Sequence, residues 1–249
     1  MKYVLIFCIL ATAACAPLYL GRDKKPARSV ADAQRELHDR VASKSKPAVL
    51  FVGNSYSFGM PKALAAECAK HDQPIRIGHS TFSGWSLAQH VKNESTLKKI
   101  REGKWDVVVL QEQSQIPSFK GFRRNHRMLP AVKKLAAEAR AAGAVPVLYQ
   151  TWGRLHGDQQ NVPGDTSAAM SARLAEGYRV ASKAAGGLVV IPAGDAWAKE
   201  IATGHGNQLF IEDGSHPTSI GNQLTARVFY NSLFSAVHDN GIALRGIVP

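Results

Sequence analysis

Two polar stretches at opposite ends of the chain carry the residue types that nucleophilic catalysis requires. Ser55 lies in a Gly-Asn-Ser turn directly after the apolar run 48–52, and Asp213 lies three residues before His216. A serine hydroxyl becomes a nucleophile when an imidazole accepts its proton and a carboxylate orients that imidazole. Each stretch alone also fits an ordinary polar turn, but together they indicate acyl-group chemistry at a serine.

The turn that holds Ser55 is expected between a central strand and the helix after it. The strand spans 48–52, and Pro61 lies at the start of a helix over 61–71, where its missing N–H costs nothing. Open α/β sheets place their ligands at the carboxyl ends of parallel strands. The general Gly-x-Ser-x-Gly elbow is not matched, because Ser57 occupies its second glycine position.

Apolar strands and helices alternate along the rest of the chain. Strands are expected at 48–52, 74–79, 106–110, 145–150 and 188–191. Helices are expected at 29–43, 61–71, 86–92, 95–102, 127–142, 166–185, 195–203 and 217–237. This alternation predicts an α/β fold, a three-layer α/β/α arrangement around a five-stranded parallel sheet.

Two long loops and the last helix are expected to contact the sheet in different ways. The loops 111–125 and 151–165 follow predicted strands, and loops of this length are typical of functional segments. The last helix carries Ile220, Leu224 and Val228 on one stripe, which is expected to pack on the sheet.

The N-terminus has the composition of an export signal. Residues 1–15 combine a charged start, an apolar core and small residues before a cysteine. Residues 12–15, Thr-Ala-Ala-Cys, resemble a bacterial lipobox, which predicts a lipid-anchored periplasmic or cell-surface protein. Cleavage after Ala13 is the alternative and predicts a secreted protein. Residues 16–28 are expected to form a tether, and residues 29–249 a single domain.

Over most of residues 47–237 the chain resembles the SGNH hydrolases, also called the GDSL esterase/lipase superfamily. Gly-Asn-Ser at 53–55 stands where the family has Gly-Asp-Ser, Gly84 matches the second block, and Asp-x-x-His at 213–216 matches the last. The third block departs from the usual Gly-x-Asn-Asp. At 111–115 it reads Gln-Glu-Gln-Ser-Gln, closer to the Gln-Gly-Glu-Ser turn of the sialate O-acetylesterase and acetylxylan esterase branch.

The resemblance implies a flavodoxin-like SGNH sheet and a serine mechanism. Ser55 would attack an ester carbonyl, with His216 as general base and Asp213 orienting the imidazole. No metal and no cofactor is implied. Asn54 is expected to contact the substrate, and activity is expected to rise with pH as the imidazole loses its proton.

Three hydrogen-bond donors are expected to hold the tetrahedral oxyanion. Two are the backbone N–H groups of Ser55 and Gly84. The third is the side-chain amide of Gln111, which directly follows the strand, with Gln115 as the alternative; a glutamine amide is chemically competent for this role. Trp152, after the fourth strand, is expected either to line the substrate pocket or to pack in the core.

The chain is basic, with a net charge of +12. Positive charge is dense from the loop after the third strand onward, at Lys120, Arg123, Arg124 and Arg127. This stretch either attracts an anionic glycan or lipid surface or forms a solvated basic face. Nucleic acid is not expected, because an exported protein seldom meets it. Cys68 is expected to be a buried core thiol rather than a nucleophile.

These observations favour an exported serine esterase that removes an acetyl or other short acyl group from a carbohydrate. Two alternatives stay open. An acyltransferase would use the same scaffold to move acyl groups between glycans, and a non-catalytic surface lipoprotein would bind an anionic glycan without turnover. The acyl group and the acceptor are left unnamed, because likeness of fold does not supply a substrate.

Overall fold

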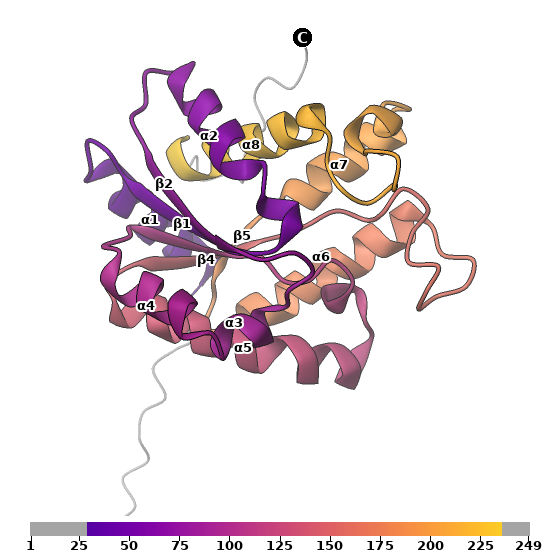
Figure 1. Ribbon diagram of the computed structural model, residues 1–249, viewed down its shortest axis with the longest axis horizontal. Coiled ribbons are helices and arrows are strands. Elements are labelled where there is room, and N and C mark those ends of the chain that lie inside the picture. The colour runs from indigo at the N-terminus through magenta and orange to yellow at the C-terminus, as the bar shows by residue number, and fades with distance from the viewer. Residues whose placement is uncertain (1–28, 236–249) are drawn as a thin grey trace, which may run out of the picture.

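A parallel sheet with the strand order β2-β1-β3-β4-β5 runs through the computed structural model, which describes residues 29–235 (Figure 1). The strands are β1 (Ala48–Gly53), β2 (Arg76–Thr81), β3 (Val107–Leu110), β4 (Val145–Tyr149) and β5 (Val189–Ile191). Within β1, Leu50 pairs with Gly78 on one side and with Val108 on the other. The predicted α/β fold with a five-stranded parallel sheet is confirmed.

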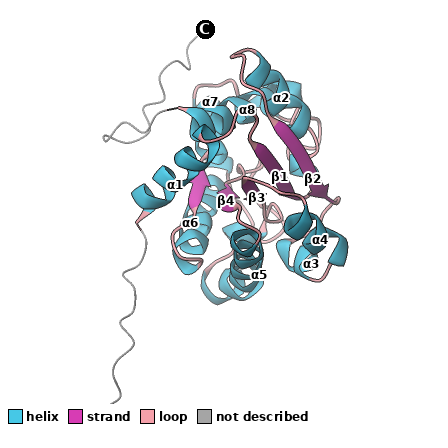
Figure 2. Ribbon diagram, turned by 90° about the vertical axis from the view of Figure 1, so that its left-hand side faces the viewer, coloured by secondary structure: helices cyan, strands magenta, loops and turns pink. Residues whose placement is uncertain are grey.

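Helices cover both faces of this sheet (Figures 1 and 2). They are α1 (Val30–Ala42), α2 (Met60–Ala69), α3 (Leu87–Val91), α4 (Glu94–Glu102), α5 (Gly121–Ala141), α6 (Ser167–Ala184), α7 (Ala193–Ala202) and α8 (Ser219–Phe234). Phe51 and Val109 point into a core formed with α1, α2, α7 and α8. Leu50 and Val108 point into a second core, formed with α3 to α6. Successive strand residues thus enter opposite cores, as expected for a sheet buried on both faces.

The predicted loop 111–125 is wrong in its second half. It contains a one-turn 3-10 helix, Ile116–Ser118, and then α5, which begins at Gly121 rather than near 127. The first turns of α5 are polar and largely exposed, so apolar periodicity does not mark them. Arg123 and Arg124, expected in the loop, therefore lie on α5 together with Arg127, and Lys120 directly precedes the helix.

Two other elements begin later than predicted. β2 begins at Arg76, and the last helix begins at Ser219, after Thr218 has capped its first turn with a side-chain hydroxyl. The predicted apolar stripe is wrong at Ile220, which is 45% exposed, while the other two members of the stripe are buried. Ile220 lies in the first turn of α8, outside the contact between that helix and the sheet.

The export signal, the lipobox and the tether fall in residues 1–28, outside the described residues, and stay predictions. Between residues 29 and 235, no helix is long and apolar enough to cross a membrane. Cys68 is buried on α2, and burial, followed by the neighbouring charge of Glu67, raises the pKa of its thiol to about 11. A thiol with that pKa is protonated near neutral pH, which agrees with a core role and argues against a nucleophile.

Candidate active site

The turn after β1 presents Ser55 at the carboxyl edge of the sheet. Ser55 opens a one-turn 3-10 helix that Asn54 caps, since Oδ1 of Asn54 accepts a hydrogen bond from the N–H of Tyr56 at 3.1 Å. Gly53 leaves no room for a side chain, because a Cβ there would stand 2.4 Å from Oε1 of Gln111. The Gly-Asn-Ser order thus fixes where the serine hydroxyl lies.

The loop before α8 brings Asp213 and His216 to the same edge of the sheet. Nε2 of His216 lies 2.8 Å from Oγ of Ser55, and Nδ1 lies 2.5 Å from Oδ2 of Asp213. The second carboxylate oxygen accepts backbone N–H bonds from Ser215 at 2.8 Å and from His216 at 2.9 Å. Gly214 takes the positive φ of 62° that this tight turn requires. The structure therefore joins the three predicted side chains in one hydrogen-bonded chain.

The electrostatics of this loop favour an ionised Asp213. Burial acts to raise the pKa of Asp213, but hydrogen bonds from His216 and from the backbone of Ser215 outweigh it, so the pKa lies below its ordinary value. An ionised Asp213 accepts a hydrogen bond from Nδ1–H of His216 and so leaves Nε2 free to accept one from the Ser55 hydroxyl. With side-chain exposures of 38% for His216 and 44% for Asp213, the pair is accessible to water.

A buried aromatic stack braces the serine turn and the histidine loop against each other. The ring of Trp152 stacks on Tyr56, with centroids 4.8 Å apart, and on Trp197, with centroids 3.8 Å apart. Nε1 of Trp152 donates to the carbonyl of Ser215 at 3.0 Å, and the Tyr56 hydroxyl lies 2.6 Å from Oγ of Ser215. The same side chains therefore fix the position of the serine turn relative to the histidine loop.

Two residues expected beside the substrate are buried instead. Trp152 is fully buried and packs in the core. Asn54 is 2% exposed, and its Nδ2 donates to the carbonyl of Trp85 at 2.9 Å, which ties the serine turn to the loop after β2. The prediction that Asn54 contacts the substrate is wrong, and of the two roles expected for Trp152 the structure shows packing in the core rather than a pocket wall.

Two backbone donors are available next to the serine turn. The N–H groups of Ser55 and Gly84 have no hydrogen-bond partner within the part of the chain that the structure describes. Gly84 has a φ of +70°, and its loop adjoins the serine turn through a 3.2 Å bond from the N–H of Phe82 to the carbonyl of Gly53. Both groups can therefore donate to an oxyanion, as the sequence predicts.

Gln111 is wrong as the third donor. Its Nε2 donates to Oδ1 of Asn54 at 3.0 Å and to the carbonyl of Glu112 at 2.5 Å, so both amide hydrogens are used. Its Oε1 accepts from the N–H of Asn54 at 2.9 Å and from the hydroxyl of Ser57 at 3.0 Å. Gln111 is fully buried and supports the serine turn.

Gln113 is the glutamine of this turn whose amide is available. The alternative donor, Gln115, uses its Nε2 on Asp158 at 2.7 Å and on Gln160 at 3.2 Å. Gln113 is partly exposed, and its Oε1 accepts hydrogen bonds from the N–H groups of Gln115 at 2.9 Å and Ile116 at 3.2 Å. Its Nε2 makes only long contacts, at 3.5 Å to Oγ of Ser114 and at 3.4 Å to Oε1 of Gln115. Sequence reasoning missed Gln113, although it is third in its block, like the asparagine of Gly-x-Asn-Asp.

Comparison with known proteins bears on this fold. No family model and no curated protein matches the sequence. A protein from Slackia heliotrinireducens, classed as a candidate SGNH hydrolase, matches with a TM-score of 0.61 at 28% identity, over 76% of this chain and 99% of that one. A DUF4886 family protein from Bacteroides uniformis gives 0.65 at 19% identity, over 80% and 89%. A variant of an acetyl xylan esterase from Geobacillus stearothermophilus gives 0.57 at 14% identity, over 77% and 97%.

By its fold, the chain is a member of the SGNH hydrolase superfamily. The SGNH blocks appear in order: Ser55 follows β1, Gly84 follows β2, the glutamine turn follows β3, and His216 precedes α8. Because the carboxyl ends of parallel strands meet at one edge, segments far apart in the sequence form one site. The fold and this arrangement support an ester-hydrolysing enzyme.

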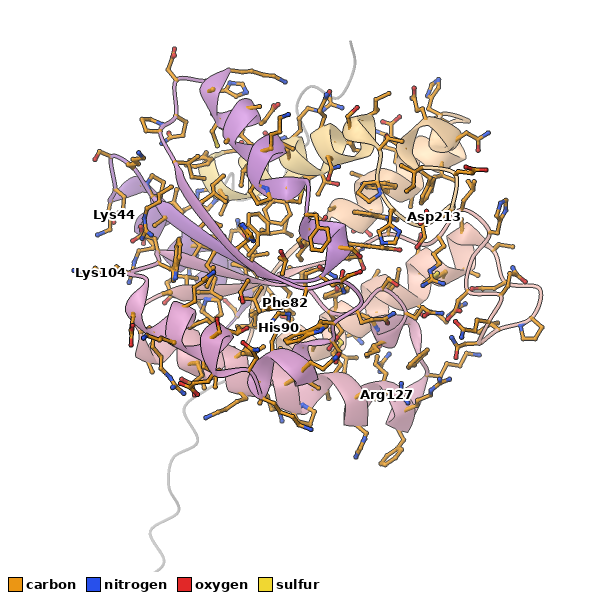
Figure 3. The ribbon with its side chains drawn as sticks, in the orientation of Figure 1. Lys44, Phe82, His90, Lys104, Arg127 and Asp213 are labelled. Carbon is orange, nitrogen blue, oxygen red and sulfur yellow. The ribbon has the colours of Figure 1, made fainter. Side chains whose placement is uncertain are left out.

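Two ionisable side chains, His90 and Glu112, are buried beneath the serine turn and the glutamine turn. Nε2 of His90, labelled in Figure 3, lies 2.8 Å from the carbonyl of Gly53, and burial lowers the pKa of His90, so a neutral ring donates this bond. Oε1 of Glu112 accepts from the N–H groups of Leu87 at 3.0 Å and Gln113 at 2.7 Å, while Oε2 has no partner among the described residues. Burial raises the pKa of Glu112 to about 7. Both side chains hold backbone groups next to the serine turn and in the glutamine turn.

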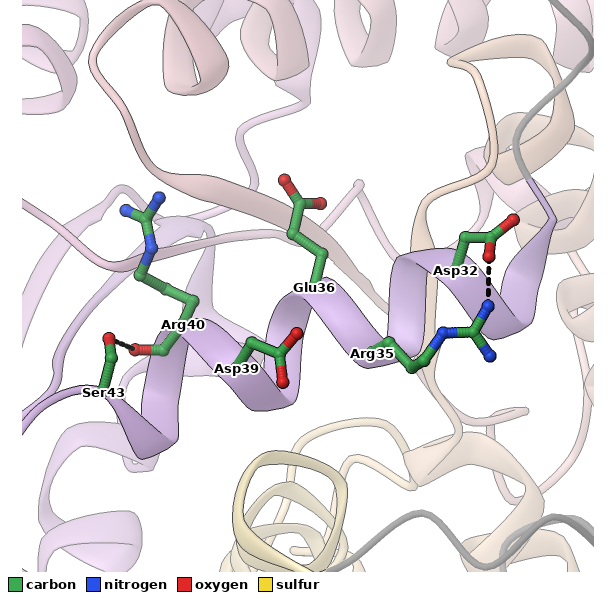
Figure 4. Close-up of a pocket in the computed structure, with 6 residues that line it drawn as sticks. All are labelled: Asp32, Arg35, Glu36, Asp39, Arg40 and Ser43. Atoms are coloured by element: carbon green, nitrogen blue, oxygen red, sulfur yellow. Dashed lines mark hydrogen bonds and ion pairs between the residues drawn. The ribbon is translucent and has the colours of Figure 1, made fainter.

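No group of three or more His, Cys, Asp or Glu within residues 29–235 is arranged to hold a metal ion. A separate hollow, lined by none of the SGNH blocks, lies along α1 (Figure 4). It is lined by Asp32, Arg35, Glu36, Asp39, Arg40 and Ser43. Asp32 and Arg35 form an ion pair on one exposed helix face, and the lining contains no histidine that could act as a base.

Proposed function

We propose that this chain is a serine esterase of the SGNH type, with Ser55 as nucleophile, His216 as general base and Asp213 as the orienting group. The observation that carries the proposal is the pair of hydrogen bonds through the imidazole. One spans 2.8 Å from Oγ of Ser55 to Nε2, and the other spans 2.5 Å from Nδ1 to Asp213. This geometry gives the serine a base and gives the base the correct tautomer.

In the acylation step, the oxygen of Ser55 attacks the ester carbonyl carbon while its proton moves to Nε2 of His216. The negative charge on the tetrahedral oxygen is stabilised by the N–H groups of Ser55 and Gly84 and by the amide of Gln113. Collapse of this intermediate breaks the bond to the alcohol, and His216 gives its proton to the leaving oxygen. Asp213 keeps the imidazolium oriented and compensates its charge.

In the deacylation step, a water molecule attacks the acyl carbon on Ser55 while His216 takes one of its protons. The second tetrahedral intermediate uses the same three donors. Its collapse releases the carboxylic acid, and the proton on His216 returns to the serine oxygen. The accessibility of the imidazole, with its side chain 38% exposed, suits the entry of this water.

The substrate that we propose is an acetyl or other short acyl ester of a carbohydrate. A solved structure with this fold is that of an acetyl xylan esterase. The loop that carries Gly84 also carries Phe82 and Trp85, which are at least partly exposed and whose ring centroids lie 4.2 Å apart. Phe58, just after the serine turn, is 53% exposed. Exposed aromatic rings beside a polar site suit the apolar face of a sugar ring.

A panel of p-nitrophenyl esters of graded chain length, together with acetylated sugars, tests this function. We expect turnover to be fastest with acetate and to fall as the acyl chain lengthens. Acyl transfer to an added sugar, at the expense of hydrolysis, would favour the acyltransferase alternative. Glycan binding without any turnover, unaffected by Ser55→Ala, would favour the non-catalytic alternative.

We also propose that the protein is exported and carries lipid on Cys15, on the strength of the sequence 1–15. Mass analysis of protein extracted from membranes should show a diacylglyceryl group on an N-terminal Cys15. A soluble protein with a free N-terminus at Ala14 would contradict lipidation and indicate ordinary secretion.

A further inference from the structure

An arginine beside the catalytic loops has no carboxylate partner. Nη2 of Arg154, in the loop after β4, donates to Oγ of Ser114 at 3.0 Å, and its Nε is buried without a partner among the described residues. No ion pair to Arg154 occurs within residues 29–235, whereas Arg173 is paired with Asp165 at 2.5 Å. A guanidinium whose Nε–H is buried and unpaired, and which has no counter-charge, is costly, and an anionic ligand can supply the missing partner.

The position of Arg154 is fixed by its chain neighbours. Its own N–H donates to Sδ of Met170 at 3.4 Å, and the N–H of Leu155 donates to the carbonyl of Gly214 at 2.8 Å. Gly153 packs so closely on α6 that a Cβ there would stand 2.4 Å from a backbone carbonyl oxygen. Arg154 is therefore held next to the histidine loop before any ligand binds, which lowers the entropy cost of binding.

Hydroxyl groups connect Arg154 to the catalytic pair. Burial raises the pKa of Tyr56, and the hydrogen bond to Ser215 and the charge of Arg154 oppose that rise, which places the guanidinium near the tyrosine hydroxyl. The ring of Tyr56 in turn meets the imidazole of His216 edge-on, with centroids 5.3 Å apart. One side chain thus separates Arg154 from the catalytic base.

We propose that Arg154 binds a carboxylate of the substrate, and that the site therefore acts on the acyl ester of an acidic sugar, a uronic acid. The planar guanidinium matches a carboxylate with two parallel hydrogen bonds, which an ammonium group cannot do. The Ser215 hydroxyl, next to the histidine, can add a further donor. This inference rests on the proposed esterase function and adds the charge of the substrate to it.

The charge distribution at the start of α5 agrees with an anionic substrate. Lys120, Arg123 and Arg127 are exposed there, and the first turn of the helix has no acidic residue. Positive charge at a helix N-terminus opposes the helix dipole, so stability of the helix does not account for it. A field of this sign raises the local concentration of anions. Arg127 itself lies far from Asp213 in Figure 3, so it can attract a substrate without contacting the reacting ester.

The test uses two acetylated methyl glycosides that differ only in charge, a uronic acid and its uronamide. We expect the unaltered protein to favour the acid about 10- to 100-fold in kcat/KM, the range of one charge-assisted pair. Arg154→Gln should bring this acid-to-amide ratio close to one, and Arg154→Lys should keep part of it. Arg127→Gln is the matched control, because it removes the same charge from the exposed part of α5: it should weaken the long-range attraction of the acid but keep most of the ratio.

An Arg154→Gln protein in which both rates fall together at an unchanged ratio would overturn the proposal, because Arg154 would then only brace Ser114 and Tyr56. An unaltered protein that does not discriminate between acid and amide would also overturn it. Calorimetric binding of the free uronate to Ser55→Ala separates this inference from the esterase proposal. If Ser55→Ala binds the uronate and Ser55→Ala/Arg154→Gln does not, the arginine site is supported even if no ester is hydrolysed. If Ser55→Ala does not bind the uronate, the arginine site is contradicted.

Discussion

The three glutamines of the turn after β3 have different partners, so alanine variants separate catalytic from structural roles. Gln113→Ala removes the amide that no strong acceptor holds in the structure. We expect kcat to fall about 100- to 1000-fold, the cost of losing one oxyanion donor. The free energy of unfolding should fall by only about 1 kcal/mol, since the main loss is the acceptor for the N–H groups of Gln115 and Ile116.

Gln111→Ala should have the opposite balance of effects. The side chain is fully buried and makes four hydrogen bonds, and without it the N–H of Asn54 and the hydroxyl of Ser57 lose their acceptor. At about 1–3 kcal/mol for each unsatisfied buried group, we expect the free energy of unfolding to fall by about 2–6 kcal/mol. Activity falls with stability, because the serine turn loses its support.

The assay pairs urea unfolding, followed by tryptophan fluorescence, with kcat for p-nitrophenyl acetate. Gln113→Glu is the sharper variant, because it keeps the Oε1 acceptor and replaces the donor by a negatively charged oxygen. Gln115→Ala is the matched control, since that amide is used on Asp158 and Gln160. A Gln113→Glu protein with near-normal kcat, or a Gln111→Ala protein that loses kcat at full stability, would refute this assignment.

Three further predictions concern the support and protonation of the site. Trp152→Phe leaves the carbonyl of Ser215 without its 3.0 Å hydrogen-bond donor. The free energy of unfolding should therefore fall by about 3 kcal/mol and kcat by about 10-fold, and no change in either value would contradict the bracing role. Burial raises the pKa of Glu112 from its ordinary value of about 4.5 to about 7, so Glu112 binds its proton more tightly in the folded state. Its contribution of about 3 kcal/mol to the free energy of unfolding is therefore lost as pH rises from about 4.5 to 7. Glu112→Gln should flatten that part of the unfolding free energy against pH, and an unaltered slope would argue for an ordinary carboxylate. The value of kcat/KM should fall on acidification, because the mechanism needs an unprotonated base, whereas Asp213, with its lowered pKa, stays ionised; a profile flat down to pH 4 would exclude a histidine base.

The fold can be predicted from the sequence because the three central strands, β1, β3 and β4, are buried on both faces. Runs such as 107–110 consist of apolar, mostly β-branched residues with no polar alternation, and the helices between them carry clear apolar stripes. The start of α5 cannot be found this way, because its first turns contact little of the core. Exposed helical turns leave no periodic signal, so loop and helix look alike there.

Some residues of the candidate site can likewise be predicted from the sequence, and others cannot. Ser55, Asp213 and His216 can be predicted because their place is tied to strand ends and to chain order. The amide donor cannot, because the roles of Gln111 and Gln113 depend on side-chain partners contributed by distant segments. Oδ1 of Asn54 accepts a hydrogen bond from the side-chain amide of Gln111, whereas the side-chain amide of Gln113 has no acceptor at short range among the described residues.

The burial of Trp152 is likewise set by tertiary contacts. It follows a strand at the active edge, which on sequence alone fits either a pocket wall or the core. Trp197 of α7 stacks on it at 3.8 Å, and this contact between segments far apart in the chain decides in favour of the core. Arg154 is a similar case, because only the structure shows that no carboxylate of the described residues reaches it.

Covalent labelling of the nucleophile tests the central claim most directly. A fluorophosphonate should add one phosphonyl group to the protein, peptide mass analysis should place it on Ser55, and labelling and ester turnover should both disappear in Ser55→Ala while the unfolding free energy is kept. His216→Ala should also abolish labelling, and the double variant should be little worse in turnover, because the members of such a unit are not additive. Label on Ser57 instead, or near-normal turnover by Ser55→Ala, would contradict the account.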